Sequence, residues 1–250
     1  IAQVAMKTKH QDSKENGFHI EYSGGKLLQK EEFVCEIGTT IEVKNLFFNV
    51  PARRSFLKSE SVEFTHLRHE FERIAMAHND VKLTLSQNNV EIYNLPVGNL
   101  RKRITDILGK NSNEKLVPIS ENTDIVSVTG FVGKPESAKK TRGEQFFFVN
   151  NRFFKHAYFH HAIAKAFEQL IPEKTFPSYF VFFEINPAKI DINVHPTKTE
   201  INFEESKFIY SILLSSIKQA LGKYNISPTI DFDIDRSFDV PISQRNEQPK

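Results

Sequence analysis

The first part of the chain alternates apolar and polar residues, which is the pattern of half-buried β-strands. The alternation runs through Ile1–Met6 and Phe18–Tyr22, after which Ser23-Gly24-Gly25 supplies the residues of a turn. Two further strands are predicted, one in the run that ends at Cys35 and one over Thr40–Val43. Consecutive strands joined by short turns predict an antiparallel sheet.

Helical spacing replaces this alternation after residue 50. Pro51 suits the first position of a short helix, where its missing N–H has no intrahelical partner. A longer helix is predicted to begin at a cap, Ser59 or Ser61, and to end near Asn79. The apolar residues that we expect on its buried face are Phe64, Leu67, Phe71 and Ile74. A hairpin of strands over 81–86 and 90–93 follows.

The turn at Leu95–Gly98 is interpreted as a domain boundary. A helix from Leu100 ends at Gly109, which is a suitable C-cap residue. Residues 110–124 are polar and rich in asparagine, which favours a surface loop. Strands are predicted over 125–132 and 145–149, on either side of a charged connection at 134–143.

The last hundred residues continue with a predicted helix over 157–170. Tyr179–Ile185 is apolar almost throughout, as expected of a strand covered on both faces. Together with the strand at 145–149, these elements predict a strand–helix–strand unit. Asn202 and Glu205 resemble a capping box for a final helix that ends at Gly222. Residues 226–250 are interpreted as a poorly structured linker.

Charge and composition exclude several classes of protein. The 33 Lys+Arg and 31 Asp+Glu leave a formal net charge of +2, so any nucleic-acid binding must come from local basic patches. The single cysteine, Cys35, excludes a disulfide framework and a multi-cysteine zinc site. His66 with His69, and His156 with His160, have no third ligand nearby in the sequence, so no metal site is predicted.

Two further expectations concern the context of the chain. No apolar run approaches the ~20 residues of a membrane-spanning helix, so no membrane partner is predicted. The chain opens on Ile1, inside a strand-like alternation, and we interpret it as a fragment whose N-terminal portion is missing.

Two segments are more specific than packing alone requires. Residues 38–58 have the sequence GTTIEVKNLFFNVPARRSFLK, and residues 191–203 have the sequence DINVHPTKTEINF. A third, shorter segment is Val149-Asn150-Asn151-Arg152. In this order the segments resemble the signatures of the MutL family of DNA mismatch-repair proteins, which belong to the GHKL ATPases. The resemblance extends from residue 1 to about residue 224.

The resemblance implies a role in nucleotide binding for two of these segments. Gly38, Thr39 and Thr40 match a family element that lines the nucleotide pocket, although a β-turn alone also explains such residues. Lys198 matches a lysine that reaches the ATP γ-phosphate from the second domain, as a mobile charge that detects this phosphate. His195 and Pro196 are expected to order the loop that carries Lys198. The implied cofactors of the intact protein are ATP and Mg²⁺.

Other ATPase motifs of the resembled family do not occur in this chain. GHKL ATPases use an Asn and a Glu on one helix, an Asp-x-Gly-x-Gly segment for adenine and a glycine-rich lid. Without the general base and the Mg²⁺ ligand, the set of groups that phosphoryl transfer requires is incomplete. We therefore predict that the chain alone binds no nucleotide measurably and does not hydrolyse ATP.

Basic residues beside the motifs are the candidates for DNA contacts. Arg152 stands at the family's "V-N-x-R" position, where the resemblance implies DNA contact, and Arg53, Arg54 and Lys58 are further candidates. The residues Lys139, Lys140 and Arg142 of the charged connection serve equally well as solvated surface charges.

The predicted fold class is α+β. Residues 1–95 are interpreted as the C-terminal part of a GHKL ATPase domain, and residues 96–225 as a transducer domain with a ribosomal-protein-like fold. The resemblance implies that the strand–helix–strand unit crosses over with the rare left hand.

The resemblance also implies a function for the intact protein. It would be an ATP-dependent, DNA-binding dimer in the bacterial cytoplasm, at the nucleoid when active, that connects the mismatch-recognition protein MutS with strand-processing factors. The alternative hypothesis is a nucleic-acid-binding or interaction module of similar fold with no nucleotide role.

Overall fold

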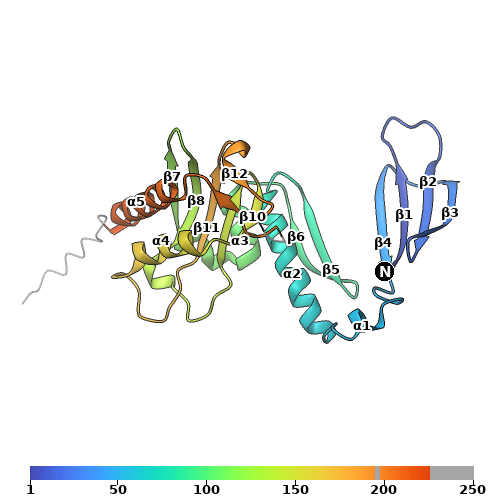
Figure 1. Ribbon diagram of the computed structural model, residues 1–250, viewed down its shortest axis with the longest axis horizontal. Coiled ribbons are helices and arrows are strands. Elements are labelled where there is room, and N and C mark those ends of the chain that lie inside the picture. Colours follow the sequence, from blue (N-terminus) through green and yellow to red (C-terminus); the bar gives the residue numbers. More distant parts are fainter. Residues whose placement is uncertain (195–197, 226–250) are drawn as a thin grey trace, which may run out of the picture. The chain divides into compact units, whose positions relative to one another are not determined.

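The computed structural model describes residues 1–194 and 198–225, which form two compact units (Figure 1). Unit 1 comprises Ile1–Glu70, and unit 2 begins at Phe71. The division falls inside one helix, α2 (Glu60–Ala77), so that this helix belongs to both units. Among the described residues, none of the helices combines the length and apolar character needed to cross a membrane.

Unit 1 contains the predicted antiparallel sheet, with strands in the order β3-β2-β1-β4. The bounds of the strands are Gln3–Lys9 for β1, Gly17–Ser23 for β2, Lys26–Phe33 for β3 and Gly38–Lys44 for β4. The short helix α1 (Pro51–Arg54) follows, with Pro51 in its first turn as predicted.

The sheet of unit 1 has one apolar and one charged face. The strand registers place Val4 beside Tyr22 and Val43, and Met6 beside Ile20 and Ile41, on one face. Ile41 and Val43 are more than half exposed, and the only buried residue in 1–70 is Gly17. Within unit 1, the apolar face therefore has no hydrophobic core of its own.

Unit 2 is built on a five-stranded sheet in the order β10-β9-β11-β8-β7. Its strands are β7 (Leu116–Asn122), β8 (Ser127–Gly133), β9 (Gln145–Val149), β10 (Arg152–Phe154) and β11 (Tyr179–Glu184). Strands β9 and β11 are parallel neighbours and are connected through α4 (Ala157–Phe167), which confirms the strand–helix–strand unit. The hand of this crossover stays a prediction.

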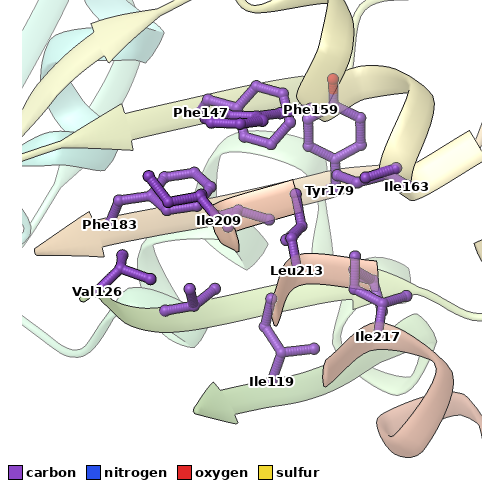
Figure 2. Close-up of a cluster of buried hydrophobic side chains, with 14 of the residues drawn as sticks. Ile119, Val126, Phe147, Phe159, Ile163, Tyr179, Phe183, Ile209, Leu213 and Ile217 are labelled. Carbon is purple, nitrogen blue, oxygen red and sulfur yellow. The ribbon is translucent and has the colours of Figure 1, made fainter. Parts of the chain in front are cut away.

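Each face of this sheet carries a hydrophobic cluster. Alternation along β9 directs Phe147 and Val149 into one cluster, and Phe146 and Phe148 into the other. The first cluster is covered by α4 and by α5 (Ser206–Asn225), as Figure 2 shows for Phe159, Ile163, Ile209 and Leu213. Since both faces are buried, the apolar run of β11 needs no polar alternation, as predicted.

The second cluster joins the sheet to the segment that precedes it. Ala75 and Met76 of α2, Leu95 at the end of the β5–β6 hairpin and Ile104 of α3 (Leu100–Leu108) share this cluster with the phenylalanines of β9 and β11. The hairpin consists of β5 (Leu83–Gln87) and β6 (Val90–Leu95). The compact unit that begins at Phe71 therefore includes residues 71–95. The assignment of residues 1–95 and 96–225 to two functional domains stays a prediction.

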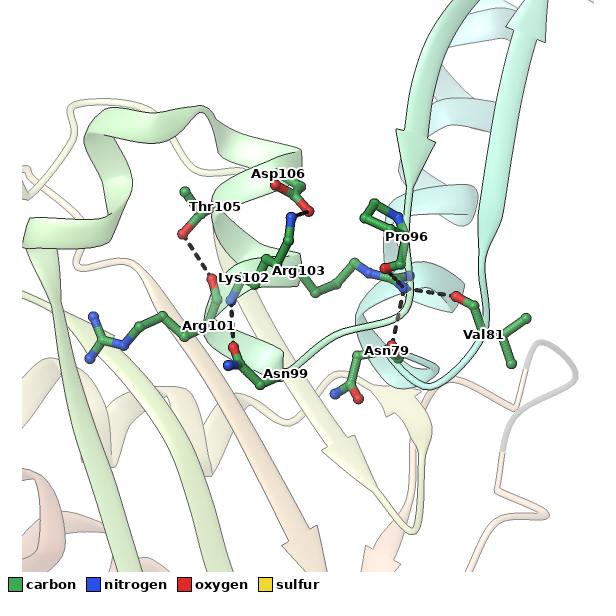
Figure 3. Close-up of polar contacts among 9 residues, drawn as sticks. All are labelled: Asn79, Val81, Pro96, Asn99, Arg101, Lys102, Arg103, Thr105 and Asp106. Carbon is green, nitrogen blue, oxygen red and sulfur yellow. Dashed lines mark hydrogen bonds and ion pairs between the residues drawn. The ribbon is translucent and has the colours of Figure 1, made fainter.

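A buried arginine, Arg103, connects α2, the β5–β6 hairpin and α3 by hydrogen bonds. Arg103 of α3 is 1% exposed, and its guanidinium donates hydrogen bonds to four main-chain carbonyls. Figure 3 shows the bonds to Asn79, Val81 and Pro96. The acceptors are Ala75 O at 2.9 Å, Val81 O at 2.8 Å, Pro96 O at 3.1 Å and Asn79 O at 3.3 Å. These carbonyls lie at the C-terminal end of α2 and at both ends of the hairpin. Arg103 thereby holds α2, the hairpin and α3 together.

Several element predictions were wrong. Residues 110–124 contain the edge strand β7, where Pro118 is tolerated because an edge strand has one unpaired side. Asn202 lies in the short strand β13 (Asn202–Phe203), which pairs with β12 (Ile190–Asp191), so it does not cap α5. Helix α5 continues beyond Gly222 to Asn225.

Helix α2 also differs from its prediction in the face that it buries. Its buried residues are Glu72, Ala75 and Met76, whereas Leu67 and Ile74 are more than half exposed. The interpretation of residues 226–250 as a linker falls outside the described residues.

Candidate nucleotide and nucleic-acid sites

The hairpin between β9 and β10 positions Arg152. Asn150 and Asn151 form its two-residue turn with φ angles of 48° and 63°, a conformation that asparagine tolerates and that two-residue hairpins require. The Asn150 side chain donates to Ile185 O at 2.9 Å and accepts from Ile185 N at 3.1 Å. The turn is therefore fixed to the end of β11, and Arg152 follows it with an exposed side chain at the start of β10.

Strand β10 itself is well anchored. Phe154 is 1% exposed within the cluster that α4 and α5 cover. The ring of Phe153 lies beneath the guanidinium of Arg73, whose Cζ is 4.2 Å from the ring centroid. The first residue of β10 is thus held in place by the two that follow it.

The segment that carries Lys198 runs beside the end of β10. The Lys155 amide donates to Thr199 O at 2.7 Å, and Lys155 forms an isolated parallel bridge with Glu200. The Nε of Arg152 donates to the main-chain carbonyl of Lys198 at 3.4 Å. The structure therefore brings together two predicted site residues, Lys198 and Arg152. His195 and Pro196, which we expected to order this loop, lie outside the described residues.

Lys198 is exposed and has an uncommon backbone conformation. Its φ angle is 51°, in the left-handed region that residues other than Gly, Asn and Asp seldom adopt. Main-chain hydrogen bonds on the C-terminal side fix this backbone, while the ammonium group is left in solvent. A long flexible side chain on a fixed backbone suits contact with a mobile anion such as a phosphate.

A hollow of about 470 Å³ lies next to this segment. Lys155, His156, Val194 and Glu200 line part of it. His156 caps α4 because its Nδ1 accepts from the amide of Phe159 at 3.3 Å, and burial lowers the pKa of its imidazole. In the described part of the chain, no group of three or more His, Cys, Asp or Glu side chains could hold a metal ion.

Gly38, Thr39 and Thr40 open strand β4 in unit 1. Gly38 has a φ of 130°, and an added Cβ would meet no atom within 4 Å, so backbone conformation and not crowding favours glycine there. Thr39 Oγ1 lies 2.8 Å from Thr8 Oγ1, and both residues border a hollow of about 600 Å³ with Gly38. Thr40 follows on the opposite face of the strand, so one ligand in this hollow meets Thr39 rather than both hydroxyls.

Arg53 and Arg54 lie on α1 of unit 1, and both are exposed. The turn before α1 contains two residues with positive φ, Asn45 and Phe47. The candidate residues are thus divided between the units: Gly38–Thr40, Arg53 and Arg54 in unit 1, and Arg152 and Lys198 in unit 2. A nucleotide shared by Gly38 and Lys198 stays a prediction.

The sequence interpretation missed the residues that support Lys198. Strand β10 was not predicted, and neither were the roles of Lys155 and Glu200 beside the loop. A signal was present, because Asn-Asn followed by the alternating Arg152-Phe153-Phe154 is a short hairpin pattern.

Comparison with known proteins gives consistent matches over the whole chain. Residues 104–222 match the family model of the DNA mismatch repair protein, C-terminal domain. The DNA mismatch repair protein MutL of Christiangramia forsetii is 49% identical over 248 residues, and that of Flavobacterium psychrophilum is 51% identical over 248 residues. Each alignment covers 99% of this chain and 40% of the relative. The chain thus spans about 40% of the length of these relatives.

Solved structures with the same fold include two repair proteins. The N-terminal domain of a DNA repair protein matches with a TM-score of 0.77 at 20% identity, covering 91% of this chain and 74% of that one. The Aquifex aeolicus MutL ATPase domain complexed with ADP matches with a TM-score of 0.63 at 19% identity, covering 85% of this chain and 72% of that one. At these identities the likeness concerns the fold, which confirms the α+β class.

Proposed function

Because the chain belongs to the MutL family of DNA mismatch repair proteins, we propose that it is part of an ATP-dependent repair protein that binds DNA. The observation that carries this proposal is the identity of about one half over 99% of the chain, which includes both motif segments. The comparisons do not favour the alternative of an interaction module without a nucleotide role.

The nucleotide would be ATP, held partly by residues of this chain. The hollow beside Gly38 and Thr39 offers a hydroxyl donor, and the exposed ammonium of Lys198 offers a positive charge for the γ-phosphate. ATP would supply a phosphoanhydride whose cleavage builds up negative charge on the phosphate oxygens. Lys198 would stabilise that charge and would distinguish ATP from ADP by the presence of the terminal phosphate.

Mg²⁺ and the catalytic base are not assigned to residues of this chain. No metal-binding cluster occurs among the residues that the structure describes. We therefore propose that hydrolysis requires the remaining length of the protein. The ADP complex of the Aquifex aeolicus relative supports a nucleotide in the longer protein.

DNA and other proteins are the proposed partners. Arg152, Arg53 and Arg54 would contact the DNA backbone, each with a guanidinium fork that fits phosphate oxygens. A dimer of the longer protein, formed with ATP, would connect the mismatch-recognition protein MutS with strand-processing factors. The proposed location is the bacterial cytoplasm, at the nucleoid during repair.

The test of the nucleotide proposal is the Lys198→Ala substitution in the longer protein. Loss of a charge that contacts the transferred phosphate is expected to lower the ATP hydrolysis rate about 10²-fold to 10³-fold. The rate is measured as phosphate release at saturating ATP and Mg²⁺.

A matched control is Lys174→Ala. Lys174 is also an exposed lysine with a positive φ, 60°, so both substitutions remove one charge and leave a Cβ in a similar backbone conformation. The control is expected to hydrolyse ATP at the unaltered rate. Equal rates for Lys198→Ala and Lys174→Ala would contradict the phosphate contact.

A further inference from the structure

The backbone at Lys198 is held from one side by the strand that carries Arg152. The Thr199 carbonyl accepts from the Lys155 amide, and the main chains of Glu200 and Lys155 form an isolated β-bridge. The Lys198 carbonyl accepts from the Arg152 side chain. A lysine with a φ of 51° persists only when its surroundings favour that conformation over a relaxed one. Of these contacts, only the one from Arg152 uses a side chain.

Arg152 uses a single nitrogen for this contact. Its Nε donates to Lys198 O at 3.4 Å, which is long for a hydrogen bond, and the acceptor is an uncharged carbonyl. Among the described residues, no carboxylate forms an ion pair with Arg152 and no acceptor is bound by its terminal nitrogens. The guanidinium is planar, so the fork of terminal N–H groups lies in a fixed relation to the Nε–H.

We propose that Arg152 is a positioning residue for Lys198, with its Nε–H on the Lys198 carbonyl and its terminal fork on one nucleic-acid phosphate. This inference rests on the proposed function, because it links the proposed DNA contact to the proposed γ-phosphate contact. A phosphate on the fork restricts the rotation of the guanidinium and holds the Nε–H group toward the Lys198 carbonyl. The bond from Nε to Lys198 is then occupied for more of the time, and the backbone that carries the ammonium side chain becomes more restricted.

The coupling is reciprocal. If a bound phosphate on Arg152 favours one conformation at Lys198, then occupation of Lys198 by the nucleotide favours phosphate binding at Arg152 by the same factor. A single side chain thus connects the two ligands through one carbonyl group, without a rearrangement of the sheet.

Arg152→Gln and Arg152→Met provide a matched pair of variants. The Gln Nε2 lies at the same distance along the side chain as the Arg Nε, so Gln keeps an N–H donor for Lys198 O. Met has a similar length but no donor. Both variants lack the guanidinium charge and the fork, and of the two only Gln has an N–H donor for Lys198 O. Because residue 152 is exposed, neither variant disturbs the core.

The first measurement is hydrogen–deuterium exchange in this 250-residue chain. The peptide that covers residues 198–203 is expected to exchange roughly twofold to tenfold faster in Arg152→Met than in Arg152→Gln, the range of one ordinary hydrogen bond. Peptides of β11 serve as the internal reference, and both variants should match there. Equal exchange at 198–203 in the two variants would overturn the positioning role.

The second measurement is ATP hydrolysis by the longer protein without DNA. Arg152→Met is expected to have a KM for ATP about twofold to tenfold higher than that of Arg152→Gln, since rescue by Gln requires the retained donor. Equal KM values would also overturn the inference. Failure of the proposed function has a different signature, because Lys198→Ala would then hydrolyse ATP as fast as Lys174→Ala.

Discussion

Arg103 is the residue on which unit 2 depends most directly. Its guanidinium is buried, forms no ion pair with another described residue, and donates to four carbonyl oxygens. Arg103→Met keeps much of the packing but removes one donor from each of these carbonyls, of which Asn79 O retains the Gly98 amide at 3.0 Å. We expect the free energy of unfolding of unit 2 to fall by about 3–5 kcal/mol, as for other buried charge networks that lose one member.

Chemical denaturation followed by circular dichroism measures this loss. The matched control is Arg101→Met on the same helix. Arg101 also donates to carbonyls, Asn113 O at 2.9 Å and Leu116 O at 3.2 Å, but its side chain is only partly buried. Its loss should cost about 1 kcal/mol. Equal losses for the two variants would show that the burial of Arg103 adds nothing.

The roles of individual side chains were predicted only for residues that match a family motif. Arg152 and Lys198 were selected by motif, and the structure places them side by side. Arg103 could not be selected, because a charged residue in a helix is usually exposed and the sequence does not reveal four distant carbonyls. Its partners at 75, 79, 81 and 96 converge only after the hairpin has folded onto α3.

Among the secondary-structure elements, strands with clear alternation were predicted well, and the errors at β7 and α2 have separate causes. Strand β7 was assigned to a loop because the polar residues at 110–115 dominated the composition and concealed Leu116, Val117 and Ile119. For α2, apolar spacing indicated one stripe, but the tertiary contacts of unit 2 bury Ala75 and Met76 instead. Tertiary packing decides which apolar face is covered, and local periodicity alone does not contain that information.

Helix α4 should respond to pH through its cap. Burial lowers the pKa of His156 from its ordinary value of 6.5, because desolvation disfavours the charged imidazole. The neutral ring accepts from the Phe159 amide, which a ring protonated at both nitrogens cannot do. As the pH falls, His156 is therefore protonated at a higher pH in the unfolded chain than in the folded one. The contribution of the neutral cap to the free energy of unfolding is fully present above about pH 6.5 and declines as the pH falls below that value.

The test is His156→Asn, which keeps a capping acceptor that does not titrate. We expect the variant to lose less unfolding free energy than the wild type between about pH 7 and pH 5. A residual decline is expected from His160, whose pKa is lowered by burial first and by Arg142 and His161 next. Parallel pH profiles for variant and wild type would contradict the role of the cap.

At the scale of the molecule, the two units differ in how complete their cores are. Unit 2 covers both faces of its sheet, whereas the apolar face of unit 1 retains Ile41 and Val43 at 62% and 61% exposure. An amphipathic sheet gains stability by covering its apolar face. The chain spans about 40% of its relatives, so we expect the stability of unit 1 to depend on the longer protein.

The net charge of the chain determines what kind of DNA binding to expect. A formal charge of +2 provides little long-range attraction, so binding must come from a few phosphate contacts and the counterions that they release. A phosphate contact contains no sequence information. We predict that Arg152→Glu weakens DNA binding by the longer, ATP-bound protein about equally on matched and mismatched duplexes. The salt slope should fall by about one unit, measured at ATP concentrations that saturate each variant.

The control for this prediction is Lys110→Glu, which makes the same change in net charge at another exposed position of unit 2. Binding is measured over a salt series for both variants on both duplexes. If the net charge alone governed binding, the two variants would weaken it equally, and the local contact at Arg152 would be rejected. A loss confined to mismatched DNA would instead require direct contact between this region and the lesion, since a backbone contact affects every sequence alike.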